Sequence, residues 1–310
     1  MSGDRKKKRR IKYQLLDEPP TGVSFVALDC SALAPGASPP GSTTQFIDKG
    51  AQKLTNIHLM LIFWGIQWAG NPTLAAEVEG TVKNLLAGPY MSYLAQYGVR
   101  RASIYGTTKV VDSDPPDPFA TSDIGNFIIN EIDNDTLPEP DRDWPIVYAV
   151  FMPSNVSFVD PQVGGANSRI MWRDYDLGDS DKDPAYYFWV GQGEWIDQPG
   201  APVDYITTAL SHELVEICTD PNGGDGIVQI GGKQHLSQVG DVCTTWCDYV
   251  RGVKVQSYWV HNLGDPRNGK CVLPKYYSVR RTLAGRNFGG RLRSIQDPIP
   301  SLNSLIASLF

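Results

Sequence analysis

The sequence contains no continuous run of about 18 apolar residues, the length from which a segment is taken to span a bilayer as a helix. Its basic start is not followed by the apolar segment that a secretory signal requires. No internal repeat is visible either. We therefore expect neither a transmembrane segment nor a standard export signal in the 310 residues.

Charged residues make up only 20% of the chain, and the formal net charge is −6. This balance does not favour a nucleic-acid or membrane-surface binder, and we expect no nucleic-acid partner. The basic residues nevertheless gather at residues 5–10 and 280–293. Runs of like charge usually repel one another and stay solvated, and contact with an acidic partner is the alternative.

Cysteine is scarce, with five residues at Cys30, Cys218, Cys243, Cys247 and Cys271. An odd number cannot pair completely within one molecule, so at least one thiol is free or intermolecular. The count alone leaves the redox compartment open. With 41% hydrophobic residues, the chain is long enough to bury one large core or two small ones.

Composition divides the chain into three parts. Residues 1–44 form a basic lead-in with a short strand at 23–28 and a linker rich in Ala, Pro, Gly and Ser. Residues 45–275 carry the main domain. Residues 276–310 form a basic tail that ends in a short amphipathic helix, which docks on its own domain or contacts a partner.

Residues 57–64 form a nearly continuous apolar run, which is typical of a central strand covered on both faces. Further strands are expected at 102–111, 145–152 and 186–190, with a polar, Asp-rich loop between the last two. Helices are expected at 73–87 behind a Thr73 cap, in a short stretch that ends at Gly98, and around 124–132 behind a Thr121-Ser122 cap. This order predicts a mixed sheet with packed helices, in the α/β or α+β class.

The segment from Ser211 to Pro221 carries the strongest functional signal. Asp204 can cap a helix on which His212 and Glu216 lie one turn apart on the same face. An imidazole nitrogen and a carboxylate oxygen can converge there on one cation, as the two histidines of H-E-x-x-H do in zinc peptidases. Glu216 replaces the second histidine and is itself an ordinary zinc ligand.

Glu213 follows the first ligand directly and points to a flank of the metal. A general base belongs at that position, because it can take a proton from a metal-bound water that attacks a carbonyl carbon. It would then pass the proton to the leaving nitrogen. The predicted reaction class is therefore amide hydrolysis, with Glu213 as the catalytic residue.

The third metal ligand is less defined by the pattern. Pro221 should end the helix near Thr219 and leave Asp220 extended, which makes Asp220 a candidate. Asp241, in a loop downstream, is preferred, and the alternatives are His235 and His261. Cys243 and Cys247 could belong to a separate zinc site, although this spacing without a second pair is a weak signal.

Several segments resemble the bacterial and fungal relatives of the plant phosphate-induced, exordium-like proteins. They lie in this order within residues 55–274: 58–65, 88–91, 211–221, 239–243 and 255–259, followed by Cys271-Val272. The resemblance implies a zincin-like fold with the metal on the His-Glu helix, a disulfide between Cys243 and Cys271, and an extracellular protein. Without a visible signal peptide, export would use a non-standard route. Gln238 stands where relatives often carry an acid.

Two functions follow from these observations. The first is a zinc-dependent metallopeptidase that cleaves a peptide or protein substrate, with His212 and Glu216 as ligands and Glu213 as base. The second is a non-catalytic zincin-like module that holds a structural ion such as calcium, because the oxygen ligands of Asp220 and Asp241 suit hard cations.

Overall fold

The computed structural model describes residues 45–141, 143–160, 163–172, 183–191, 202–230, 238–244, 246–262 and 265–274, which all belong to one compact unit. The predictions made for the lead-in, for the C-terminal tail and for His235 lie outside these residues. No helix in the described part of the chain is long and apolar enough to cross a membrane.

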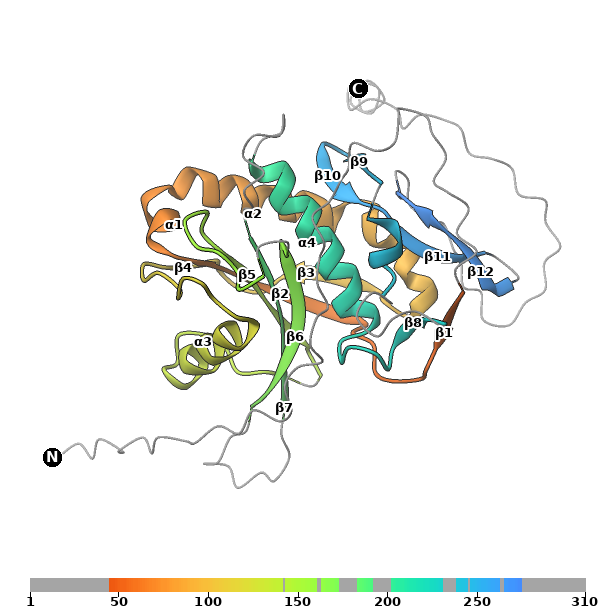
Figure 1. Ribbon diagram of the computed structural model, residues 1–310, viewed down its shortest axis with the longest axis horizontal. Coiled ribbons are helices and arrows are strands. Elements are labelled where there is room, and N and C mark those ends of the chain that lie inside the picture. The colour runs from red at the N-terminus through yellow and green to blue at the C-terminus, as the bar shows by residue number, and fades with distance from the viewer. Residues whose placement is uncertain are drawn as a thin grey trace, which may run out of the picture. The chain divides into compact units, whose positions relative to one another are not determined.

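The apolar run predicted as a central strand forms β2 (Asn56–Trp64), whose last six residues are all buried. Strands β3 and β4 pair with it in parallel on one side and β5 on the other. Parallel β7 follows β5, and β6 forms the edge, antiparallel to β7 (Figure 1). The other strands are β3 (Arg101–Ile104), β4 (Lys109–Val111), β5 (Ile146–Phe151), β6 (Gly165–Trp172) and β7 (Asp183–Val190). The predicted mixed sheet is thus confirmed.

Strand β6 lies where the sequence predicts a loop. Its small and polar residues give no apolar run, so the strand period is not visible in the sequence. Ala166 and Ile170 join the core formed with α3, whereas Asn167 between them contacts α4 on the opposite face. Asn167 is polar because this face of β6 contacts the glutamates of α4, and not because the segment is a loop.

The single strand predicted at 102–111 is two short strands, β3 and β4, which pair with successive parts of β2. A turn with Gly106 at a φ of +57° separates them. Glycine adopts this left-handed conformation without a steric penalty.

Helices cover both faces of the sheet (Figure 1). One face packs against α2, the 3-10 helix η1 and α4, and the other packs against α3. The helices are α1 (Ile66–Gly70), α2 (Pro72–Ala87), η1 (Tyr90–Tyr97), α3 (Thr121–Asp133) and α4 (Pro202–Thr219).

The helix starts differ slightly from the predicted caps. The Asn71 side chain accepts a hydrogen bond from the Leu74 amide at 3.2 Å, so α2 is capped by Asn71 and not by Thr73. Helix α3 includes Thr121 and Ser122 in its first turn. Helix α4 begins at Pro202, which places Asp204 inside its first turn and not at the cap.

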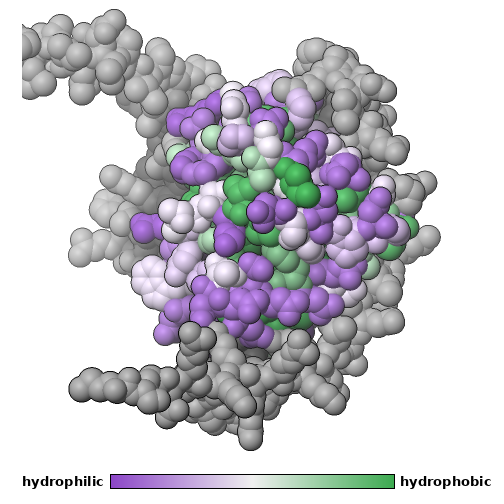
Figure 2. All heavy atoms as spheres, turned by 90° about the vertical axis from the view of Figure 1, so that its left-hand side faces the viewer, coloured by the Kyte–Doolittle hydropathy of each residue, from purple (hydrophilic) through white to green (hydrophobic). Residues whose placement is uncertain are grey.

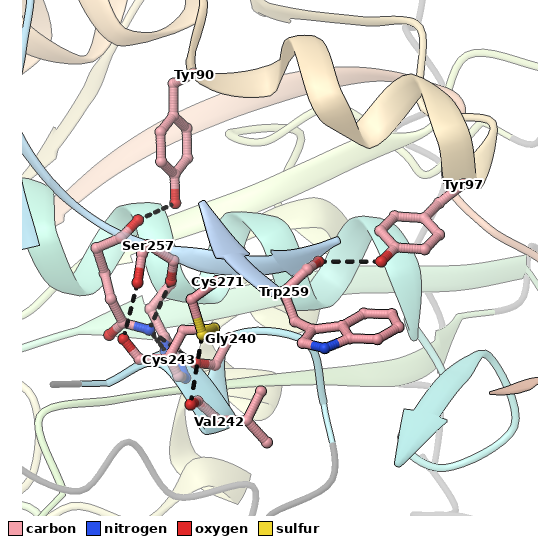
Figure 3. Close-up of a disulfide and its surroundings, with 10 residues drawn as sticks. Tyr90, Tyr97, Gly240, Val242, Cys243, Ser257, Trp259 and Cys271 are labelled. Atoms are coloured by element: carbon pink, nitrogen blue, oxygen red, sulfur yellow. Dashed lines mark hydrogen bonds between the residues drawn. A yellow bond between two sulfur atoms is a disulfide. The ribbon is translucent and has the colours of Figure 1, made fainter. Parts of the chain in front are cut away.

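Outside the main sheet, the described residues form antiparallel pairs that the sequence pattern does not reveal. Three tyrosines attach the C-terminal pairs to the helical layer. The Tyr90 hydroxyl donates to the Gln256 carbonyl at 2.8 Å, and the Tyr97 hydroxyl donates to the Trp259 carbonyl at 3.0 Å (Figure 3). The Tyr258 hydroxyl donates to the Tyr90 carbonyl at 2.5 Å. The pairs are β1 (Phe46–Asp48) with β8 (Ile227–Gln229), β9 (Cys247–Val250) with β10 (Val253–Gln256), and β11 (Tyr258–Asn262) with β12 (Asp265–Val272).

A disulfide joins Cys243 to Cys271 across a Cα–Cα distance of 5.7 Å, as the family resemblance implies (Figure 3). Cys247 is also disulfide-bonded. The alternative of a separate zinc site on Cys243 and Cys247 is therefore wrong, because neither sulfur is available as a thiolate ligand. Cys218 on α4 is a buried free thiol.

Figure 2 shows the end of the molecule at which α1, β4 and α3 lie. Polar side chains predominate there, with apolar ones between them. Ile66 of α1 and Val110 of β4 are among the exposed apolar residues. Isolated exposed apolar side chains are normal on a soluble surface.

Candidate metal centre

Helix α4 is buried on every side over most of its length, from Ile206 to Thr219. It packs against the sheet, against α2 and against β10 (Figure 1). It ends at Thr219 as predicted, two residues before Pro221. Buried ionisable side chains are costly unless they are paired or bind a metal, so His212, Glu213 and Glu216 on this helix require an explanation.

His212, Glu216 and Asp241 form a group that could hold a metal ion. His212 Nε2 lies 3.1 Å from Glu216 Oε1 and 3.8 Å from Asp241 Oδ1. One ligand atom from each residue lies within 4.8 Å of the others. Asp241 comes from the short 3-10 helix η3 (Asp241–Cys243), where Oδ2 accepts a hydrogen bond from the Gln238 amide at 3.0 Å. The structure therefore unites both ligands predicted on the helix with the preferred third ligand.

The donor set and the space around it fit a small divalent ion. Zinc binds imidazole nitrogen and carboxylate oxygen at about 2.0–2.2 Å, so that two ligands of one ion lie roughly 3–4 Å apart. Beside the group, Gly240 leaves room that a side chain would fill. An added Cβ there would lie 2.7 Å from Glu216 Oε1 and 2.9 Å from His212 Nδ1.

The electrostatics of the group favour a bound cation. Burial, followed by the charge of a neighbouring acid, raises the pKa of Glu213 and Glu216 well above the usual range. The same two causes raise the pKa of Asp241 to about 8. Burial lowers the pKa of His212, which favours the neutral imidazole that metals bind. Within the described residues, no Lys or Arg lies at ion-pair distance from these carboxyl groups.

Gln256, at the end of β10, contacts the imidazole at Nδ1, the ring nitrogen other than the one that lies beside Glu216 and Asp241. Its amide nitrogen lies 2.9 Å from His212 Nδ1 and donates to the Gly240 carbonyl at 2.9 Å. Its backbone is fixed as well, because its amide donates to Ser211 Oγ at 2.9 Å and its carbonyl accepts from Tyr90. Sequence reasoning missed this role, although Gln256 belongs to the segment 255–259 that carries the family resemblance.

Glu213 lies beside the ligand group and is not part of it. Its side chain is fully buried, and its Oε2 accepts a hydrogen bond from Asn167 Nδ2 at 3.3 Å. Its Oε1 has no hydrogen-bond partner in the part of the chain that the structure describes. A buried carboxylate oxygen without a donor, next to a group that could hold a metal, matches the position predicted for a general base.

Asp220 does not join the ligand group. Its carboxylate accepts three backbone hydrogen bonds, from Gly224 at 2.6 Å, Asp225 at 3.1 Å and Gly226 at 2.8 Å. Asp220 therefore stabilises the loop that follows α4, and the structure does not bring this candidate third ligand into the group. Both oxygens are committed to amide donors, which the sequence pattern could not reveal.

The two histidine alternatives have different outcomes. His261 packs its ring against Tyr97 and Trp259, at centroid distances of 5.3 and 4.7 Å, and is not in the group. His235 lies outside the described residues. Gln238 contacts Asp241 through its backbone amide.

Comparison with known protein families, curated proteins and solved structures finds no match. The resemblance to the exordium-like family therefore stays a prediction. What the centre does must be argued from its own geometry.

Proposed function

We propose that this protein is a zinc-dependent peptidase of zincin-like fold. His212, Glu216 and Asp241 would hold the ion, and Glu213 would act as general base. The observation that carries the proposal is the buried His-Glu-Asp group with the unpartnered Glu213 Oε1 beside it.

The chemistry of the residues follows from their positions. A zinc ion, when bound, lowers the pKa of a water ligand and polarises a carbonyl oxygen. Glu213 would accept the proton of the attacking water at Oε1 and deliver it to the leaving amine. Gln256 contacts the His212 ring at Nδ1, and the Gln238 amide donates a hydrogen bond to Asp241. Burial keeps bulk water away from the three carboxyl groups.

The position of β6 supports a peptide as the substrate. Strand β6 is the edge of the sheet and pairs only with β7 among the described strands. It packs against α4, and its Asn167 reaches the two glutamates. An extended peptide can add to an exposed sheet edge through backbone hydrogen bonds. A chain bound along β6 would bring its amide bonds close to Glu213.

One observation favours the second function, a module with a structural ion. His212, Glu213 and Glu216 are each at most 1% exposed. A structural site needs no access for a substrate, whereas a peptidase must open to admit one. In that case calcium is the alternative to zinc, since two of the three ligands are carboxylates.

Metal analysis and a cleavage assay separate the two functions. We expect protein purified without added metal to contain one zinc per chain and to cleave members of a peptide library. Glu213→Gln should keep the zinc and lower kcat by at least 100-fold, since general-base catalysis typically contributes about 10²–10⁴-fold.

The matched control is Glu77→Gln, the same change at an exposed position of α2, which should leave both properties intact. Unchanged cleavage by Glu213→Gln would contradict the assignment of Glu213 as general base. Stoichiometric calcium without cleavage would favour the structural module.

A further inference from the structure

Asn167 lies on β6, far in the sequence from the His-Glu helix. It is 8% exposed, and its strand neighbours Ala166 and Ile170 belong to the core on the other face of the sheet. A buried amide needs hydrogen-bond partners, because an unsatisfied polar group is costly in an apolar interior. Its partners lie on α4.

The amide nitrogen of Asn167 bridges two acids. Nδ2 donates to Glu216 Oε2 at 3.1 Å and to Glu213 Oε2 at 3.3 Å. A side-chain amide has two N–H donors, so one Asn can serve both carboxyl groups. The edge strand is thereby connected to both glutamates of α4 through a single nitrogen atom.

Asn167 donates to the Oε2 atom of each glutamate, so the Oε1 atom of each remains available to the metal centre. Glu216 Oε1 is the oxygen that lies 3.1 Å from His212 Nε2. Glu213 Oε1 is the oxygen without a hydrogen-bond partner among the described residues. Both Oε2 atoms are turned toward β6, and both Oε1 atoms are left for ligand binding and proton transfer.

Gly165, two residues earlier on the same face of β6, completes this arrangement. A Cβ at this position would lie 2.9 Å from Glu213 Oε1 and 3.0 Å from the Trp189 carbonyl. Because Gly165 has no side chain, there is room beside Glu213 Oε1, the oxygen to which Asn167 does not donate. Strand β6 thus shapes both sides of the Glu213 carboxyl group.

We propose that Asn167 is a positioning residue that orients Glu216 as a ligand and Glu213 as a base through one shared amide nitrogen. This inference rests on the proposed function of the centre. A neutral donor suits this role, because it holds two acids without a positive charge that would compete with the ion. An aspartate there could not donate to both, and a lysine would neutralise the acids.

The test measures zinc affinity by competition with a chromophoric chelator, together with the melting temperature of the metal-free protein. Asn167→Leu keeps the number of side-chain heavy atoms and removes the donor. We expect its zinc affinity to fall by about 10–100-fold, the usual effect of losing a residue that orients a ligand. Ser168→Ala is the matched control, because Ser168 is on the same strand and bonds to Tyr187 on the other face. Its zinc affinity should equal that of wild type.

Asn167→Ala, which is smaller and cannot clash, serves as the second variant if Asn167→Leu does not fold. A purely structural role would lower the melting temperature and leave zinc affinity within twofold of wild type in the folded variant, and that result would overturn the proposal. Wild-type protein that binds zinc but cleaves no peptide would instead refute the peptidase. The affinity test of Asn167 would be unaffected.

Discussion

Asp241 makes the stability of the metal-free protein depend on pH. Its folded pKa of about 8 lies far above the ordinary value of 3.8, first because of burial and then because of Glu216. The folded state therefore binds this proton more tightly than the unfolded chain does. The resulting stabilisation is fully present below about pH 4 and is lost as the pH rises through about 8. Glu213 and Glu216 act in the same direction.

We predict that the free energy of unfolding of chelator-treated protein decreases between about pH 5 and about pH 8.5, and that added zinc removes most of this decrease. Denaturant titration at a series of pH values measures the effect. Asp241→Asn should flatten the profile of the metal-free protein, because the amide does not titrate. A wild-type profile that is flat without metal would contradict the burial of these acids.

At the scale of single elements, the loop after α4 depends on Asp220. Its carboxylate accepts three backbone amides, and truncation would leave these donors without their acceptor. We predict that Asp220→Ala lowers the free energy of unfolding by about 2–4 kcal/mol. Its zinc affinity should change much less than that of Asp241→Ala. Equal loss of zinc in the two variants would restore Asp220 as a ligand.

The elements also show what the sequence could predict. The apolar run of β2 and the Pro221 stop of α4 are local signals, and both predictions are confirmed. Strand β6 was missed because its first five residues are small or polar, so the segment shows neither an apolar run nor a regular alternation. That His212 and Glu216 lie on the same face of α4 follows from helix geometry alone.

The remaining parts of the centre depend on contacts between distant segments. Asn167 and Gln256 come from strands on either side of α4 in the sequence, and nothing in their local pattern marks them. From the sequence, Asp220 and Asp241 are both plausible carboxylate ligands, and only the folded loops show which of them lies beside His212 and Glu216. Tertiary structure was therefore needed to choose between them.

For the whole molecule, the disulfide connects the segment that carries Asp241 to β12, so we expect its reduction to weaken the proposed metal centre. Cys243 ends η3, which begins with Asp241, and Cys271 lies in β12. The 28-residue separation corresponds to a stabilisation of about 3–4 kcal/mol in the loop-entropy account. We predict that the Cys243→Ser, Cys271→Ser double variant loses stability of this order and binds zinc more weakly.

Denaturant unfolding and chelator competition measure the two effects. The control is Cys218→Ser, which alters a buried thiol that is not disulfide-bonded. Because this variant keeps the Cys243–Cys271 disulfide, its stability should depend on reductant as that of wild type does. Unchanged zinc affinity in the double variant would show that η3 keeps its place without the covalent link.

The order of the segments along the chain has a consequence for biosynthesis. Helix α4 leaves the ribosome with two ligands in place, but Asp241 and the supporting Gln256 follow only later. A nascent chain arrested before β10 would expose an acidic helix that cannot yet retain an ion. If the centre binds zinc as proposed, the ion would be loaded late in maturation, after the C-terminal strands have docked.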